Sequence, residues 1–382
     1  MINKKRLVAL TRKVISIDST NPPGKELALA QYITKELLSW GLEAETYSFE
    51  LGRPNVISVI KGCLPPRQAR REALLLTPHI DTVPFGKGWK HDPLGGKIIR
   101  NRIYGRGATD DKGNLACSLE VMHSLIEDKV KLKRDLILAA TVDEETGSHA
   151  GIVPLLRKKI LRPGVAVILD SDEFDTIVVQ KGLIHLRVQI HGKKAHGAYN
   201  WRGISAIEVA ARIINKIKKH KWPYNKHRFL RHPTVNVGTI YGGDKVNMVA
   251  DFCEFSLDIR FLPHTNPEDV LAQVWKIVKN EAKKYTIVID NVQKPFEIDP
   301  GHNAVKTYLS SAKKMNVQPK VRGSEGATVI TFFQETGIPA FATGYGAHGT
   351  AHTNDEYAEV NTLVKGAQVL ERFVKDYCGV LS

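Results

Sequence analysis

The sequence predicts an α/β protein with two domains, and three observations support this class. The chain has 382 residues, too many for one ordinary core, and hydrophobic residues make up 42% of it, enough to fill two. Strand-like and helix-like apolar runs alternate as far as about residue 180, which is typical of a mixed or parallel sheet with helices on both faces. Beyond about Lys181 the order of elements changes to βαββαβ, the pattern of a complete small α/β sandwich.

The elements of the first domain are predicted from apolar periodicity and breakers. Helical spacing predicts two opening helices, which the breaker Asn21-Pro22-Pro23-Gly24 separates, and β-rich apolar runs predict the strands. The expected helices span 7–17, 27–40, 114–125 and 303–315; the expected strands span 55–60, 73–77, 135–142, 165–169 and 339–342; a turn over 323–327 opens the segment 328–335.

The second domain is expected to interrupt the first. Its predicted strands span 183–190, 234–240, 251–260 and 285–289, and its predicted helices span 205–217 and 267–281. We therefore expect one domain made of residues 1–180 and 292–382, with residues 181–291 inserted between its two parts.

Acids and a histidine follow the predicted strands of the first domain. The strand 73–77 runs into His79 and Asp81, the strand 135–142 into Asp143-Glu144-Glu145, and the strand 165–169 into Asp170-Ser171-Asp172-Glu173. Sites in open α/β sheets lie beyond the carboxyl ends of strands. Because acids there are costly unless they are solvated or bind a cation, the pattern indicates a metal site at this edge.

Neighbouring residues in these segments can take different roles. His79 and Asp81 share a face of an extended segment, so Asp81 can accept the ring N–H of His79 and leave the other nitrogen for a metal. The alternative is a hydrogen bond that only closes a turn. Adjacent glutamates such as Glu144 and Glu145 point different ways, so one can bind metal while the other accepts a proton from water.

A glycine-rich turn at 104–113, YGRGATDDKG, supplies Asp110 and Asp111. Glycines permit backbone angles that other residues resist, and the start of the following helix favours negative charge. The turn can therefore hold a carboxylate rigidly; taken alone, it also fits a capped helix start with solvated acids. Two more loops carry histidines: 191–197 contains His196, and 344–356 contains His348 and His352.

Composition narrows the class of protein. The formal net charge of +15 would suit a polyanion, but the Lys and Arg residues are dispersed over predicted helix faces, so we expect a solvated basic surface and no nucleic acid partner. No apolar run resembles a signal peptide or a membrane helix, so no membrane partner and a cytoplasmic location are expected. The four scattered cysteines predict buried or inert thiols.

Five segments in order, HIDTVP, GRGATDDKG, DEETG, the His196 loop and AHTNDE, resemble the dizinc aminopeptidase-like amidohydrolases of the M20 family. This family includes acetylornithine deacetylase, succinyl-diaminopimelate desuccinylase, aminoacylase and glutamate carboxypeptidase. The resemblance spans nearly the whole chain. It implies a metallopeptidase catalytic domain interrupted by a ferredoxin-like lid that mediates dimerisation, and so a homodimer.

The resemblance also implies a role for each matching residue. His79 would bind the first metal with Asp81 orienting it, Asp110 would bridge both metals, and Glu145 and His352 would bind the second. Glu144 would be the general base. The family's Gly-Glu-Pro-Thr stretch is replaced here by Leu169-Asp170-Ser171-Asp172, so Asp170 is expected as the remaining ligand, with Asp172 as the alternative. His196 resembles the lid histidine that stabilises the oxyanion in the partner's site, and Asn247 and Arg260 resemble substrate-binding positions.

The expected function is metal-dependent hydrolysis of the amide bond of an N-acyl amino acid, with two Zn²⁺ per subunit. Histidine and carboxylate ligands without thiolate suit zinc and also admit Co²⁺ or Mn²⁺. A dipeptidase or carboxypeptidase acting on short peptides is the alternative within the family, and a non-catalytic polyanion-binding protein is the alternative of another class.

Overall fold

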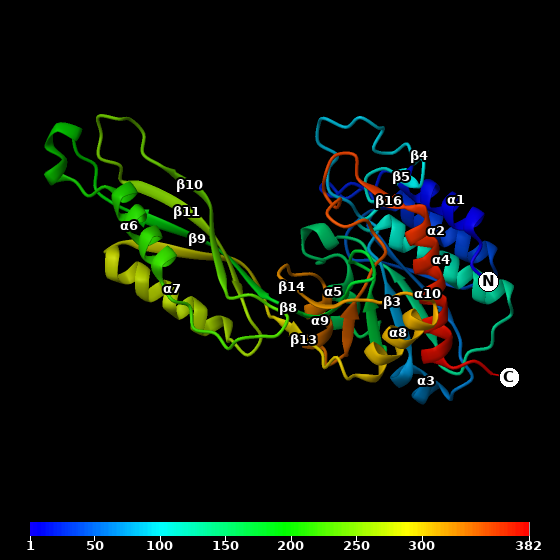
Figure 1. Ribbon diagram of the computed structural model, residues 1–382. Coiled ribbons are helices and arrows are strands. Elements are labelled where there is room, and N and C mark those ends of the chain that lie inside the picture. Colours follow the sequence, from blue (N-terminus) through cyan, green and yellow to red (C-terminus); the bar gives the residue numbers. More distant parts are fainter. Residues whose placement is uncertain (382) are drawn as a thin grey trace. The chain divides into compact units, whose positions relative to one another are not determined.

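The computed structural model describes residues 1–381, and the chain divides into two compact units (Figure 1). The first unit comprises Met1–Val178, Ile298–Arg322 and the chain from Thr328 onward. The second comprises Val179–Glu297 together with the short segment Gly323–Ala327. A turn that follows the long insertion in sequence therefore belongs to the inserted unit.

The first unit is built on a mixed sheet, as predicted. The strands of this sheet in chain order are β1 (Ala44–Ser48), β2 (Pro54–Ile60), β3 (Leu74–Thr77), β6 (Leu136–Ala140), β7 (Val165–Ile168), β8 (Thr176–Gln180), β13 (Phe296–Glu297), β14 (Val321–Ser324) and β15 (Ala340–Ala342). Of these, β13 belongs to the residues of the second unit, and β8 and β14 each include residues of both units. The spatial order is β1-β2-β6-β3-β7-β15-β8-β13, with β14 also paired to β8. The strands β6, β3, β7 and β15 run parallel, whereas β1 and β2 join antiparallel beside β6.

Burial explains why these central strands are continuous apolar runs. Every residue of β3 and β7 is buried, because a parallel strand at the centre of such a sheet is covered on both faces. The helices of this unit are α1 (Lys4–Ile15), α2 (Leu27–Ser39), α3 (Pro66–Glu72), α4 (Lys112–Glu127), α5 (Ile152–Arg157), α8 (Asn303–Lys314), α9 (Ile330–Glu335) and α10 (Val360–Cys378). A small sheet of β4 (Lys97–Ile99), β5 (Arg102–Tyr104) and β16 (Tyr357–Glu359) has the order β16-β5-β4.

The second unit is an antiparallel sheet with two helices. Its elements are β9 (Gly182–His191), η2 (Gly197–Arg202), α6 (Ala206–Lys219), β10 (Thr234–Gly242), β11 (Phe252–Phe261), α7 (Pro267–Glu281) and β12 (Tyr285–Gln293), with the strand order β10-β11-β9-β12. Alternate residues of β9, from Ile184 to Ile190, pack in one core with the apolar faces of α6 and α7. This period of two matches the alternation seen in the sequence.

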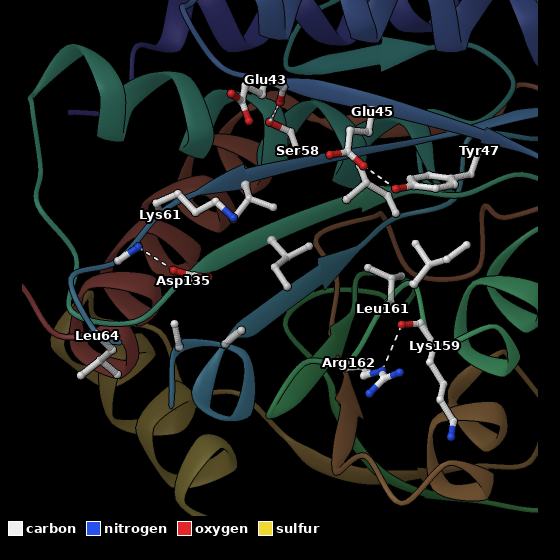
Figure 2. Close-up of a pocket in the computed structure, with 17 residues that line it drawn as sticks. Glu43, Glu45, Tyr47, Ser58, Lys61, Leu64, Asp135, Lys159, Leu161 and Arg162 are labelled. Atoms are coloured by element: carbon white, nitrogen blue, oxygen red, sulfur yellow. Dashed lines mark hydrogen bonds between the residues drawn. The ribbon is translucent and has the colours of Figure 1, made fainter. Parts of the chain in front are cut away.

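A cavity of about 580 Å³ lies at one edge of the large sheet of the first unit, and Figure 2 shows the side chains that line it. Asp135 and Leu161, which precede β6 and β7, contribute to the cavity. It therefore lies by the amino ends of these strands. Asp135 Oδ1 accepts the N–H of Gly62 at 2.7 Å (Figure 2), and the next residue, Cys63, is exposed whereas the other three cysteines are buried.

Among residues 1–381, no helix is both long and apolar enough to cross a membrane.

Candidate metal centre

Three adjacent parallel strands bring the predicted residues to the other edge of this sheet, at their carboxyl ends. His79 follows β3 and forms a parallel bridge with Thr141, just after β6. Glu144 begins the short 3-10 helix η1 (Glu144–Thr146), and Asp170 follows β7. Because β6, β3 and β7 are neighbours, these side chains enter one site, as expected for sheets of this kind.

Asp110 lies between two histidines. Its Oδ1 is 2.9 Å from His79 Nε2, and its Oδ2 is 3.1 Å from His352 Nε2. His352 Nε2 is also 3.0 Å from Glu145 Oε1. One carboxylate thus faces an imidazole with each of its oxygens, which is the arrangement that a ligand shared by two cations requires.

The donor atoms form two overlapping groups that fit divalent cations. His79, Asp110 and Glu145 form one group, and His79, Glu144 and Asp170 form the other; in each, the ligand atoms lie within 4.8 Å of one another. The donors are imidazole nitrogens and carboxylate oxygens, which zinc, cobalt and manganese accept. The peptide bond between Asp110 and Asp111 is cis.

The electrostatics of the site favour a cation. Burial, together with the charge of Asp170, raises the pKa of Glu144 well above its ordinary value. Burial and the charge of Asp110 likewise raise the pKa of Asp170 to about 7. These shifts arise because several half-buried carboxylates lie close together, and a bound cation would relieve their repulsion.

The neighbouring carboxylates raise the pKa values of the two histidines. Hydrogen bonds to Asp110 and Glu145 raise the pKa of His352 to about 10. Burial alone would lower the pKa of His79, but its hydrogen bonds to Asp110 and Asp81 outweigh this and raise it well above the usual value. For Asp110, burial alone would raise the pKa, but the hydrogen bonds from His352 and His79 outweigh it and lower the pKa below the usual range.

Asp81 contacts both His79 and the turn that carries the two glutamates. His79 Nδ1 lies 3.1 Å from the Asp81 backbone oxygen and 3.4 Å from Asp81 Oδ1. The carboxylate of Asp81 also accepts the backbone N–H of Glu144 at 3.0 Å and that of Glu145 at 3.1 Å. Asn21 donates to the same carboxylate at 2.9 Å. Asp81 therefore holds the backbone of η1 in addition to lying beside the His79 ring.

Two further buried carboxylates, which sequence reasoning did not include in the site, hold other backbone groups. Asp111 Oδ2 accepts the N–H of His79 at 3.0 Å, and Glu356 Oε1 accepts the N–H of Asp110 at 3.0 Å. Both side chains have no exposed surface. The only signal for Glu356 in the sequence is its place at the end of the segment AHTNDE, and for Asp111 its place beside Asp110.

Two residues were alternatives to predicted ligands: His348 to His352, and Asp172 to Asp170. His348 is exposed and lies 3.4 Å from Asp172 Oδ2, whereas His352 contacts Asp110 and Glu145. Asp170 belongs to the second donor group. Asp172 and His348 thus pair with each other, outside both donor groups found among the described residues.

Three predicted residues belong to the second unit. His196 is exposed, and its backbone bridges to Met248, next to Asn247. The carbonyl of Asn247 accepts the N–H of Gly197 at 2.8 Å, so His196 and Asn247 lie in adjoining segments. Arg260, at the end of β11, donates to Asp258 at 2.7 and 3.1 Å. Its guanidinium is engaged by a carboxylate of its own strand.

Comparison with known proteins gives consistent matches over most of the chain. The sequence profile "Peptidase family M20/M25/M40" matches residues 75–376. An acetylornithine deacetylase of Photorhabdus laumondii is 28% identical over 380 residues, covering 95% of this chain and 92% of the relative. An acetylornithine deacetylase of Salmonella typhimurium is 30% identical over 321 residues, covering 80% of each chain.

Solved structures share the fold at lower identity. A tripeptidase from Staphylococcus aureus superposes with a TM-score of 0.82 and 22% identity, covering 99% of both chains. A Bacillus subtilis protein described as a dinuclear metal-binding peptidase of the M20 family has a TM-score of 0.75 and 16% identity, again covering 99% of both.

Proposed function

This chain belongs to the peptidase family M20/M25/M40, and we propose that within it the enzyme hydrolyses the amide bond of an N-acyl amino acid with two divalent cations per subunit. It is a metal-dependent enzyme that acts on amide or peptide bonds. The observation that carries the proposal is the position of Asp110, whose two oxygens face His79 and His352. The dinuclear metal-binding protein of the same family supports the number of cations.

We assign each ligand from its contacts. His79 and Asp170 would hold the first cation, Glu145 and His352 the second, and Asp110 would be shared. Bound divalent cations supply Lewis-acid polarisation of a carbonyl and acidify water. Asp81 would orient His79 through its Nδ1 side and keep Glu144 and Glu145 in place through their backbone N–H groups.

Glu144 is proposed as the general base. It lies in the same turn as Glu145, and Asp81 holds both by the backbone, so the two side chains can serve different partners. Glu144 would take a proton from water at a carboxylate oxygen and pass it to the leaving nitrogen of the amide. A half-buried carboxyl whose pKa is raised is suited to hold a proton between these two steps.

The relatives favour an N-acyl amino acid as substrate. The matches that span 95% and 80% of this chain are acetylornithine deacetylases at 28% and 30% identity, whereas the two solved peptidases described above are 22% and 16% identical to it. A dipeptidase or carboxypeptidase activity is the second candidate. In either case Arg260, released from Asp258, could bind a substrate carboxylate, and Asn247 could donate to the substrate.

We also propose a homodimer formed through the second unit. Four exposed apolar side chains line one hollow of this unit: Trp201, Ile204, Ile207 and Met248, with exposed fractions from 72% for Trp201 to 36% for Met248. Exposed apolar clusters of this kind are characteristic of association surfaces. In such a dimer His196, exposed in the same region, would donate to the oxyanion in the partner's site.

A cytoplasmic location accords with four free cysteines.

Metal analysis and a substrate panel test the proposal together. The purified protein should contain two equivalents of divalent metal and should release amino acid from N-acetyl or N-succinyl amino acids. Hydrolysis of free dipeptides or tripeptides, without hydrolysis of acylated amino acids, would select the peptidase candidate. Retention of full activity by a monomer, measured by light scattering at the assay concentration, would refute the role of His196. Binding of nucleic acid without metal or turnover would reject the enzymatic assignment altogether.

A further inference from the structure

The carboxylate of Glu356 binds backbone N–H groups and a guanidinium, whereas the proposed ligands contact one another through their side chains. Its Oε1 accepts the backbone N–H of Thr109 at 2.9 Å and of Asp110 at 3.0 Å. Its Oε2 accepts the N–H of Gly107 at 3.1 Å and the Nη1 of Arg106 at 2.6 Å. The side chain has no exposed surface. Four donors from one turn of the chain thus converge on a single buried carboxylate, which places them in a fixed geometry.

The same residue belongs to the segment that carries His352. Glu356 follows His352 by four residues and directly precedes β16, which pairs with β5 just before the Asp110 turn. The backbone oxygen of Glu356 accepts the N–H of Gly105 at 2.9 Å. Thr109 Oγ1 also lies 2.9 Å from Thr350 Oγ1. The segment around Asp110 and the segment around Glu356, about 240 residues apart in sequence, are therefore linked by hydrogen bonds at Thr350, at Glu356 and along β16.

The backbone contact of Glu356 follows a pattern within the site. The N–H of His79 is held by Asp111, the N–H groups of Glu144 and Glu145 by Asp81, and the N–H of Asp110 by Glu356. Each of these acids is buried, and each binds at least one backbone N–H of a site residue; Asp81 also lies beside the His79 ring. Each of the three also lies close in sequence to another proposed ligand: Asp81 follows His79 by two residues, Asp111 adjoins Asp110, and Glu356 follows His352 by four.

We propose that Glu356 is a positioning residue that sets the distance between Asp110 and His352, and with it the affinity of the second cation. This proposal rests on the proposed function of the site. By binding the N–H groups of Thr109 and Asp110, Glu356 fixes the backbone from which the shared aspartate projects. Because His352 is only four residues away, a shift of Glu356 would also move the histidine. Groups that orient metal ligands in this way typically change metal affinity by about 10- to 100-fold when they are removed.

The test compares three variants for metal binding by the metal-stripped protein. Glu356→Gln keeps the shape of the side chain but offers one acceptor oxygen, and its NH₂ group faces the N–H of Gly107 and the Arg106 guanidinium. Glu356→Asp keeps both oxygens but shortens their reach. Glu359→Gln is the control, since Glu359 lies on the adjoining β16 and, among the residues that the structure describes, its side chain forms one exposed ion pair, with Arg102 at 3.6 Å.

Co²⁺ titration monitored by absorption, with a competing chelator, gives the two affinities directly. We expect the weaker site to lose about 10- to 100-fold in affinity in E356Q, less in E356D and nothing in E359Q, with the stronger site changing less. Thermal unfolding of the same metal-free proteins gives the loss of stability separately. A variant that unfolds early but binds both Co²⁺ ions with unchanged affinity while folded would reduce Glu356 to a structural role and overturn the proposal.

Failure of the proposed function and failure of the positioning role of Glu356 give different results. If the unmodified protein binds fewer than two ions, the proposed function itself fails. If it binds two and E356Q binds them equally well, only the positioning role fails. Should E356Q not fold, E356D decides the question, because it retains the carboxylate charge and must still bind the second ion more weakly than E359Q does.

Discussion

His352 and Glu145 are 207 residues apart in the chain, yet His352 Nε2 lies 3.0 Å from Glu145 Oε1. The same nitrogen is 3.1 Å from Asp110 Oδ2. One imidazole therefore connects the shared aspartate to the glutamate proposed for the second cation. His348 lies in the same loop but pairs with Asp172, so of the two histidines we assign the role of metal ligand to His352.

Replacing His352 should remove one cation. In H352A the second site keeps Asp110 and Glu145 but no nitrogen donor, so we expect metal content to fall from two equivalents to one and kcat/KM to fall at least about 100-fold, or about 2.7 kcal/mol in transition-state stabilisation. H348A is the matched control, because His348 is exposed and its ion-pair partner among the described residues is Asp172, which lies outside both donor groups. Equal losses in both variants would contradict the assignment.

Replacing Glu144 should stop turnover and leave the metal in place. E144Q keeps the volume of the side chain but accepts no proton, so we expect kcat to fall by about 10²- to 10⁴-fold. Glu144 also belongs to a donor group with His79 and Asp170, and metal content by elemental analysis distinguishes base from ligand. Loss of a cation from E144Q would show that Glu144 is a ligand, whereas E145Q is the variant expected to lose one.

Removing the metal should lower stability as well as activity. Asp110, Asp170, Glu144 and Glu145 face one another in the site, and cations that bind only the folded state stabilise it in proportion to their saturation. At a free metal concentration 100 times the Kd this amounts to about 2.7 kcal/mol per ion. Calorimetry with and without chelator measures it. An unchanged unfolding temperature, with full activity in chelator, would be incompatible with a metal centre.

Glu325 should make the stability of the second unit depend on pH. Its carboxylate lies 2.5 Å from the Nζ of Lys181, a lysine with no exposed surface. Burial alone would raise the pKa of Glu325, but hydrogen bonds from the Arg231 N–H and Lys181 outweigh it and lower the pKa below its ordinary value. A depressed carboxyl pKa stabilises the fold above the pKa of the unfolded chain, about 4.3, and this gain is lost as pH falls through the folded value.

The variant E325Q should therefore unfold at a lower temperature than the parent at pH 7, and the difference should shrink below about pH 4. Glu281 supplies the control, since its partners Arg212 and Lys216 are both exposed and ion pairs of this kind contribute little to stability. A difference between E325Q and the parent that stays constant from pH 7 to pH 4 would exclude the ion pair as its cause.

The central strands and their acidic ends could be predicted from the sequence. Leu74–Thr77 and Val165–Ile168 were recognised because strands covered on both faces are uninterrupted apolar runs, and the charges after them are then conspicuous. Helix α7 was expected over 267–281 and has the bounds Pro267–Glu281. The other residues of the site could be predicted from the motif segments, because each segment contains one or two His, Asp or Glu residues that are recognisable as metal ligands or bases.

Sequence reasoning missed the carboxylates whose partners are backbone N–H groups. Asp111 binds the N–H of His79 and Glu356 that of Asp110, and every residue except proline offers such a group. No residue pattern therefore marks which N–H a given acid will meet; only the folded positions do. The membership of Gly323–Ala327 in the second unit was missed for a similar reason, because Glu325 contacts Lys181, which lies 144 positions earlier in the sequence.

The exposure of Cys63 has a practical consequence. It adjoins Gly62 at the cavity shown in Figure 2, by the amino ends of the parallel strands, whereas the residues proposed to bind the cations follow their carboxyl ends. A maleimide dye would thus attach at one defined position on the native chain and spare the three buried thiols. The labelled protein would offer an optical reporter of folding whose attachment point is separated from the catalytic edge by the length of the strands.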